Sequence, residues 1–316
     1  MNHKRLQHLY LEAGLPDEFF EVVNERACRV MFPVMINGEL RPAKLTLLQR
    51  AETPRGNAVI SIGCTLLEVK EQDKRATQLF RRLLWRNQEC SLARWSAMEN
   101  TKSDGILVNP SATFVETECD GVQFLNLIGA VAQEWAGFSV QYQAVFEPVA
   151  PIGDGGLWLE DPGEAESRLF PIVSQWGREI GLPDVREIER GNVQVLFPVM
   201  SEGEIDHVPV TVITGGQTNT GQSVVHLVSS KLEIPADWHL LDRLCFHAMA
   251  ASMNATEAKW CGRPKRTDHS TYQFLTVASL FLDTSSTDQF FSAGASLTAL
   301  HATMPSLVEN VQEEAN

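Results

Sequence analysis

An internal repeat is the feature that most constrains how this chain of 316 residues can fold. Phe32–Met35 reads Phe-Pro-Val-Met, and a Gly-Glu pair follows at Gly38. The same residues recur at Phe197–Met200 and Gly203, at an offset of 165 positions (from 32 to 197). Self-similarity at one offset is typical of a duplicated supersecondary unit, so we expect two copies of one fold.

The same register continues well beyond this motif. It pairs Thr46 with Thr211, Gly56 with Gly221, Leu67–Val69 with Leu232–Ile234, and Arg94-Trp95 with Lys259-Trp260. Upstream, the sequence Gly-Leu-Pro-Asp begins at both Gly14 and Gly181, at an offset of 167 positions (from 14 to 181). The difference requires a change of length in one loop, and loops tolerate such changes.

Turn and linker residues separate the two copies. Residues 148–165 hold Pro148, Pro151, the run Gly-Asp-Gly-Gly and the run Asp-Pro-Gly. We therefore predict a first repeat at 1–147, a linker at 148–165 and a second repeat at 166–307. Residues 308–316 form a polar tail that we expect to fray.

Composition agrees with two ordinary domains and disfavours several partners. Hydrophobic residues make up 44% and charged residues 21%, as in average globular proteins. The 26 basic and 40 acidic residues give a net charge of -14, which repels nucleic acid and anionic lipid. The N-terminus lacks the apolar core of a secretory signal, and no apolar run approaches a membrane span. We expect a cytoplasmic, bacterial-style protein.

Periodicity predicts the elements of each unit. Apolar residues at helical spacing open each copy, as in Leu6, Leu9 and Tyr10, and this helix stops at Gly-Leu-Pro. A three-stranded antiparallel meander is expected next. Its strands are Cys28–Met35, Lys44–Gln49 and Ala58–Val69, matched by Val193–Met200, Pro209–Ile213 and Val224–Ile234.

A second helix, one or two further strands and a last helix complete each unit. The second helix spans 73–85 and 237–251, with Asp73 and Asp237 as expected N-caps. The strands cover Gly105–Glu116 and Thr271–Leu282, and the last helices cover Gly121–Trp135 and Asp288–Met304. The fold class is therefore α+β, with two tandem α-β-β-β-α-β-β-α units, each an antiparallel sheet packed with helices.

This element order, in an acidic chain with units of this size, resembles the type III secretion chaperone-like fold, including the YbjN-like group. The resemblance covers both copies and rests on order and size, without a diagnostic motif. It implies that the two copies form an intramolecular pseudo-dimer. It also implies that the unit holds a partner polypeptide on sheet and helix surfaces, and that fusion can make the two faces different.

The first long strand of each copy is apolar on both faces. Cys28, Val30, Phe32 and Val34 alternate with Met31, Pro33 and Met35, and the second copy repeats this with Leu196, Pro198 and Met200 on the equivalent outer face. Proline cannot donate to a ladder, so Pro33 and Pro198 predict an edge or a bulge. Met31, Pro33, Met35, Leu196, Pro198 and Met200 are therefore candidate partner-binding residues. The simpler interpretation is that a helix or the sister repeat covers this face.

Other candidate sites have plainer explanations. Gly216–Ser223 imitates a phosphate-binding loop, but Gln222 stands in the lysine place and the segment joins two strands, so a hairpin is favoured. Two basic clusters could bind an acidic protein or nucleic acid, but such clusters are more often solvated helix faces or pair with the chain's own carboxylates. They are Lys74, Arg75, Arg81, Arg82, Arg86 and Arg94, and Lys259, Arg263, Lys265 and Arg266.

Catalytic and metal motifs are not found in the sequence. His239, Cys245 and His247 lack the close ligand pairs of zinc sites, and Glu116, Glu118 and Asp120 are ordinary exposed acids at a strand end. No nucleophile motif occurs, and the six cysteines form no C-x-x-C pair. We expect no cofactor, no metal and no catalytic residue.

The sequence therefore predicts a non-enzymatic chaperone or adaptor with a protein partner. The alternative is a regulatory module that binds a small ligand between the repeats, near Trp95 and Trp260. An enzyme is the third possibility, because catalytic groups can be assembled in space without a sequence motif. The assembly is either a monomer with an internal pseudo-dimer or a homodimer.

Overall fold

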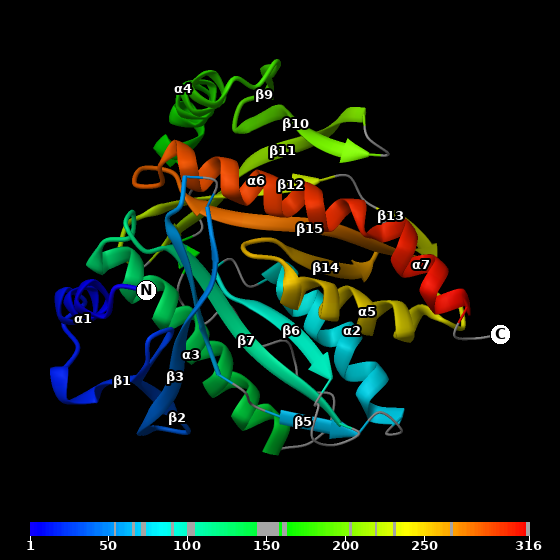
Figure 1. Cartoon of the computed structure of the whole chain (residues 1–316). Coiled ribbons are helices and arrows are strands. Elements are labelled where there is room, and N and C mark those ends of the chain that lie inside the picture. The colour runs from blue at the N-terminus through cyan, green and yellow to red at the C-terminus, as the bar shows by residue number, and fades with distance from the viewer. Residues whose placement is uncertain are drawn as a thin grey trace.

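The computed structural model describes residues 1–53, 55–64, 67–70, 74–89, 92–99, 105–143, 158–159, 163–201, 204–218, 220–229, 232–265 and 268–313. Within these residues the chain is α+β, with helices packed on two antiparallel sheets (Figure 1). The predicted fold class is confirmed.

The first half contains three α-helices, a short 3-10 helix and seven strands in the part that the structure describes. In chain order they are α1 (His3–Glu12), η1 (Asp17–Phe19), β1 (Phe20–Asn24), β2 (Ala27–Ile36), β3 (Glu39–Glu52), β4 (Ala58–Gly63), β5 (Leu67–Lys70), α2 (Lys74–Glu89), β6 (Arg94–Glu99), β7 (Gly105–Val115) and α3 (Gly121–Gln143).

The second half repeats this order and adds a short strand before it and a helix after it. Its elements are β8 (Trp158–Leu159), α4 (Gly163–Ile180), β9 (Val185–Glu189), β10 (Asn192–Ser201), β11 (Glu204–Thr218), β12 (Ser223–Ser229), β13 (Leu232–Pro235), α5 (Leu241–Asn254), β14 (Lys259–Pro264), β15 (Thr271–Phe281), α6 (Thr287–Ala302) and α7 (Met304–Glu313).

The two sheets share one topology. The first runs β1-β2-β3-β4-β7-β5 with β6 also paired to β7, and the second runs β9-β10-β11-β12-β15-β13 with β14 paired to β15. Every strand in one path has its counterpart at the same place in the other. The sequence repeat is therefore also a repeat of strand order. β8 has no counterpart in the first sheet and pairs with the end of β11.

Several element boundaries differ from the sequence expectation. β1 and β9 are additional strands of five residues each, too short for an alternating pattern to stand out. β6 and β14 are the second strands that the expected order already places after the second helix. The expectation of one strand at Ala58–Val69 and one at Val224–Ile234 is wrong, because each segment forms two strands, β4 and β5 or β12 and β13, and the later one pairs with β7 or β15. Asp237 is not the N-cap of α5, because a turn follows it and the helix begins four residues later behind Leu240, without a side-chain cap. The expected N-cap Asp73 lies outside the described residues.

The ends of the second repeat are more ordered than expected. Residues up to Glu313 form α7 instead of a frayed tail, because Leu307 and Val311, one helical turn apart, are buried. Of the expected linker, 148–157 lies outside the described residues, β8 pairs with β11, and α4 already begins at Gly163.

The two halves pack on each other reciprocally. α2 of the first half contacts β14 of the second, and α5 of the second half contacts β6 of the first. Figure 1 shows α2 and α5 side by side, and the Phe80 and Phe246 rings meet between them with centroids 5.2 Å apart. Such exchange is what a two-fold axis produces, so the chain forms an internal pseudo-dimer.

Each sheet is covered on one face by the helices of its own half. α3 packs on β2, β3, β4 and β7, and α6 packs on β10, β12 and β15. One continuous cluster of buried apolar side chains includes residues of both halves. None of the helices that the structure describes has the length and apolar character needed to cross a lipid bilayer.

Candidate functional site

Two hairpins extend beyond their neighbouring strands. β1 pairs with β2 only as far as Val30, and β4 pairs with β3 from Thr46 onward, so residues 31–44 continue as a two-stranded ribbon. In the second half, β9 pairs as far as Val195 and β12 pairs from Val210. We name residues 31–44 the first arm, and residues 196–201 with 204–209 the second arm.

The arms carry the predicted partner-binding residues on their outer faces. The opposite, inner faces pack on α3 and α6. Among the described large apolar side chains, the three most exposed lie on the arms: Leu40 at 68%, Ile205 at 66% and Met35 at 61%. Leu40 and Ile205 occupy equivalent positions, 165 apart.

The interpretation that a helix or the sister repeat covers the outer faces is therefore wrong for Pro33, Met35 and Pro198. Pro33 and Pro198 are exposed, whereas Met31 and Leu196 are half-buried. Met200 lies on β10 opposite Ile205, and its side chain is outside the described part of the structure.

Prolines occupy the open edges of the first arm, as the sequence predicts for an edge strand. Pro33 lies directly opposite Pro42 in the ladder. The Tyr10 hydroxyl donates to the Met31 carbonyl (2.6 Å), so the polar groups of Met31 point away from β3. Because this direction alternates along an antiparallel strand, the backbone of Pro33 also points to the open edge. With no N–H to offer there, Pro33 weakens the edge as a site for strand addition.

The interface between the halves contains a reciprocal pair of buried cations. Arg94 Nη1 donates to the carbonyl of Ala258 (3.0 Å), and Lys259 Nζ donates to the carbonyl of Ala93 (2.8 Å). Arg94 corresponds to Lys259, and Ala93 to Ala258, at the offset of 165. Each half therefore places a cation on the backbone of the other. Burial lowers the pKa of Arg94 to about 10, which leaves it charged at neutral pH.

Trp95 and Trp260, expected beside a ligand pocket, are core residues at 1% exposure each. Their backbone N–H groups donate to Asn87 and Ser252, which are again equivalent positions. Asn87 also crosses the interface, because its Nδ2 donates to the carbonyls of Trp95 (2.9 Å) and Trp260 (3.0 Å). The backbone of both tryptophans thus takes part in the contact between the halves, and neither residue lines the cavity described next.

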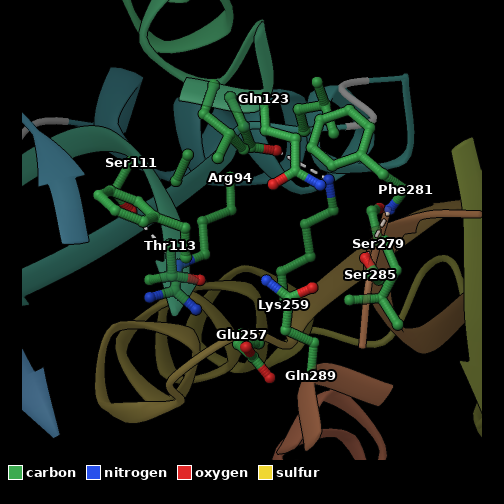
Figure 2. Close-up of a pocket in the computed structure, with 16 residues that line it drawn as sticks. Arg94, Ser111, Thr113, Gln123, Glu257, Lys259, Ser279, Phe281, Ser285 and Gln289 are labelled. Carbon is green, nitrogen blue, oxygen red and sulfur yellow. Dashed lines mark hydrogen bonds between the residues drawn. The ribbon is translucent and has the colours of Figure 1, made fainter. Parts of the chain in front are cut away.

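A small cavity with a mixed polar and apolar lining lies between the halves, next to the buried cations. It has a volume of about 50 Å³, and Figure 2 shows lining side chains from both halves. Its charged lining residues are Arg94, Glu257 and Lys259. Its polar lining residues are Ser111, Thr113, Gln123, Ser279, Ser285 and Gln289.

Glu257 is the single carboxylate among these lining residues. Burial raises its pKa to about 7, and a hydrogen bond from Ser292 and the charge of Arg94 oppose this rise in part. Its Oε2 is buried and has no hydrogen-bond partner among the described residues. An unsatisfied buried acceptor is costly, so Glu257 in its ionised form leaves room for a donor at this oxygen.

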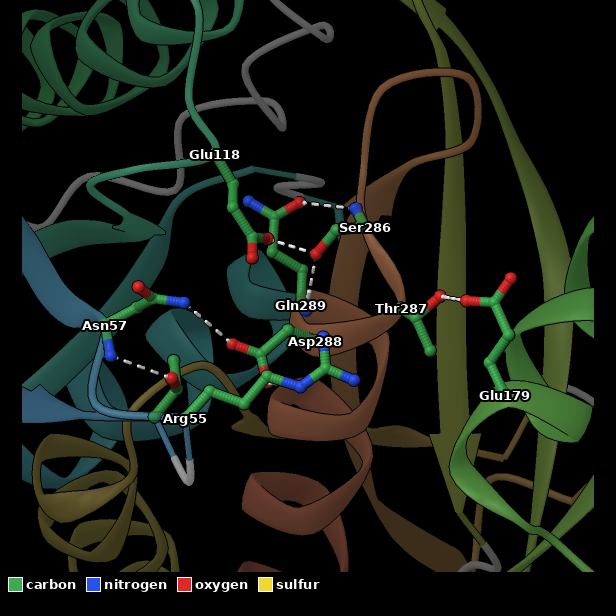
Figure 3. A network of polar contacts seen from close by, with 9 residues as sticks. Arg55, Asn57, Glu118, Glu179, Ser286, Thr287, Asp288 and Gln289 are labelled. Atoms are coloured by element: carbon green, nitrogen blue, oxygen red, sulfur yellow. Dashed lines mark hydrogen bonds and ion pairs between the residues drawn. The ribbon is translucent and has the colours of Figure 1, made fainter.

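A second polar network joins the halves at the start of α6 (Figure 3). Asn57 Nδ2 donates to Asp288 (3.2 Å), Arg55 lies 3.6 Å from the same carboxylate, and the Ser286 hydroxyl donates to Glu118. Thr220 and Gln222 of the second half correspond to Arg55 and Asn57 of the first. They make the equivalent contact with the other half, because Asn126 on α3 donates to Thr220 (2.8 Å) and Gln222 (2.7 Å). These acids and amides hold the fold together.

Three of the remaining basic candidates form ion pairs within the chain. Arg86 pairs with Glu134 (2.7 Å), Arg81 with Asp242, and Lys265 with Glu233 (2.9 Å), so these basic residues pair with the chain's own carboxylates. The side chains of Lys74, Arg75 and Arg266 lie outside the described residues. β11 and β12 are antiparallel on either side of residues 219–222, which confirms the hairpin interpretation of Gly216–Ser223.

Ser279, which lines the cavity, contacts the ring of His226. His226 Nδ1 lies 2.9 Å from Ser279 Oγ. Burial, with the nearby charge of Lys259, lowers the pKa of His226 to about 4, so its ring is neutral. In the described part of the chain no carboxylate orients this ring, so the pair lacks the third member of a catalytic triad. The same residues contain no group of three side chains suited to hold a metal.

Comparison with known proteins finds no relative of this chain: no protein-family model, no curated protein and no solved structure matches it. The resemblance to type III secretion chaperones thus stays a prediction.

Sequence reasoning missed the cavity and its charged residues. Arg94 and Lys259 belong to the two basic clusters expected on the surface or in ion pairs, and no sequence pattern singles out Glu257. One signal was available, because a basic residue precedes tryptophan in both copies at Arg94 and Lys259. A cation that precedes a core tryptophan in both copies indicates that the two cations have equivalent roles. Their burial, however, follows only from the packing of the two halves against each other.

Proposed function

We propose that this chain is a non-enzymatic chaperone or adaptor of the cytoplasm that binds a polypeptide through the outer faces of its two arms. The observation that carries the proposal is the exposure of apolar side chains at equivalent places on both arms, above all Leu40 (68%) and Ile205 (66%). Neighbouring exposed apolar residues on a folded surface are typical of interaction sites.

The arms favour binding of a partner on their outer faces over strand addition at their edges. Pro33 and Pro42 weaken strand addition at the edges of the first arm, while Met35 and Leu40 lie opposite each other on its exposed face. Methionine is unbranched and polarizable, so it adapts to varied apolar partners. A partner segment with a row of apolar side chains, in a helix or an extended strand, fits such a face.

The test is affinity capture from native lysate with the double variant Met35→Asp, Ile205→Asp. We expect reproducible partners with the unchanged chain and at least a tenfold loss with the variant, because each aspartate places a charge in the contact. Leu11→Asp is the matched control, since Leu11 is also exposed (46%) but lies on α1. Circular dichroism checks that all three proteins are folded.

Two results would contradict the proposal. One is capture of no partner by the unchanged chain. The other is capture of the same partners by the arm variant in undiminished amount, which would place the contact elsewhere on the surface.

A further inference from the structure

The cavity between the halves is positively charged although the chain is acidic. Its three charged lining residues are Arg94, Lys259 and Glu257, which leaves an excess of one positive charge even when Glu257 is ionised. Arg94 and Lys259 are 5% and 4% exposed. Water screens buried charges poorly, so they attract an anion more strongly than surface lysines do.

Two groups of this lining have unused hydrogen-bonding capacity. Arg94 uses Nη1 for the Ala258 carbonyl and Nε for Ser111 (3.2 Å), and its Nη2 has no acceptor among the described residues. In the same part of the structure Glu257 Oε2 has no donor. The lining residues thus include an unused donor and an unsatisfied acceptor, and the acceptor is itself almost inaccessible to water.

The carboxylate breaks the symmetry of the cavity. Arg94 and Lys259 are equivalent, and Gln123 and Gln289 both stand three residues after the N-cap of a last helix. Glu257, in contrast, corresponds to Leu92, at the offset of 165. The carboxylate is thus found only in the second repeat, whereas both repeats have the buried cation, Arg94 in the first and Lys259 in the second.

We propose that this cavity binds a small oxyanion that still carries a proton, of the class of bicarbonate and hydrogen phosphate. Its oxygens accept from Arg94 Nη2 and lie in the field of Lys259, and its O–H donates to the carboxylate of Glu257, which turns Oε2 toward the cavity when the anion binds. The volume of about 50 Å³ suits this class. One water-sized group needs roughly 10–15 Å³, so about four such groups fit, which accommodates the three oxygens of bicarbonate or the four of hydrogen phosphate. This inference is independent of the arms and of the polypeptide partner.

Sulfate is the discriminating probe. It resembles hydrogen phosphate in shape and charge, but it has no proton at neutral or higher pH. At about pH 8, above the pKa of about 7 for Glu257, the carboxylate is ionised and meets sulfate oxygens without a hydrogen between them. Hydrogen phosphate and bicarbonate still donate at that pH.

The experiment uses the full chain at about pH 8, in thermal melts and calorimetric titrations with sodium phosphate, bicarbonate or sulfate, each matched in ionic strength with sodium chloride. We expect phosphate, bicarbonate or both to raise Tm and to bind saturably, and sulfate to bind at least tenfold more weakly. The relative affinities for phosphate and bicarbonate show which size of anion the cavity prefers.

The variant Glu257→Gln tests the contact itself. Its amide can donate to sulfate, so the preference for phosphate over sulfate is expected to fall at least tenfold. Glu204→Gln, an exposed carboxylate on the second arm, is the control and is expected to keep the preference. Absence of saturable binding, equal binding of sulfate and phosphate by the unchanged chain, or an unaltered preference in Glu257→Gln would each overturn the inference.

Discussion

Gly129 and Gly294 occupy equivalent positions in α3 and α6, 165 apart, and each faces a phenylalanine on the first long strand of its sheet. A Cβ at Gly294 would overlap the Phe197 ring, whereas a Cβ at Gly129 would lie 3.7 Å from Phe32 Cζ, an ordinary contact. The space available for a side chain therefore differs between the two equivalent glycines. α6 approaches its sheet so closely that only glycine fits.

The first prediction is that Gly294→Ala lowers the free energy of unfolding by about 1–3 kcal/mol, because overpacking forces the ring or the helix to move. Gly129→Ala is the matched control. It is expected to be neutral or stabilising by up to about 1 kcal/mol, since alanine favours helix more than glycine does. Urea denaturation measures both, and equal effects of the two substitutions would contradict the packing argument.

At the scale of elements, the arms show how the chain presents apolar surface without extending its sheets. An unpaired ribbon has two edges that can recruit strands from other molecules. The first arm places Pro33 on one edge and Pro42 on the other. The flat apolar face then remains available while strand pairing at the edges is suppressed.

The second prediction concerns these edges. Pro33→Thr with Pro42→Thr restores one backbone N–H on each edge and introduces a good strand former, so self-association is expected to increase. Static light scattering against concentration measures it. Pro16→Thr, a change in the turn before η1, is the control. If the double variant scatters like the control, the prolines do not protect the edges.

At the scale of the whole molecule, the two halves behave as one folding unit. Their apolar side chains form one buried cluster, and α2 and α5 exchange contacts with β14 and β6. Arg94, Lys259 and Asn87 add polar contacts across the same interface. Neither half can unfold without exposing apolar surface of the other, so their unfolding is coupled.

The third prediction follows from this coupling. Phe80→Ala, which removes the ring that meets Phe246, is expected to lower stability by about 3–5 kcal/mol and to move a single calorimetric transition. Trp85→Ala on the same helix, where the side chain is 49% exposed, is expected to change stability little. Two separate transitions, of which Phe80→Ala moves one, would show that the halves unfold independently.

The predictability of the elements depended on their length and their contacts. Long periodic segments such as β2 and α3 were predicted because their apolar spacing is visible over many residues. β1 and β9 were missed because five residues do not establish a period. α7 was assigned to the tail because its apolar residues are sparse, and it is ordered by contact with α5 and α6.

The sequence by itself determined the duplication, the α+β class and the position of the main strands, because periodicity and self-similarity are local properties of the chain. Only the tertiary structure decided that the outer faces of the arms are uncovered, that Arg94 and Lys259 are buried, and that Glu257 shares a cavity with them. Burial depends on which distant segments dock. Arg94 and Ala258 are far apart in sequence and meet only because two copies of one fold pack about a shared axis.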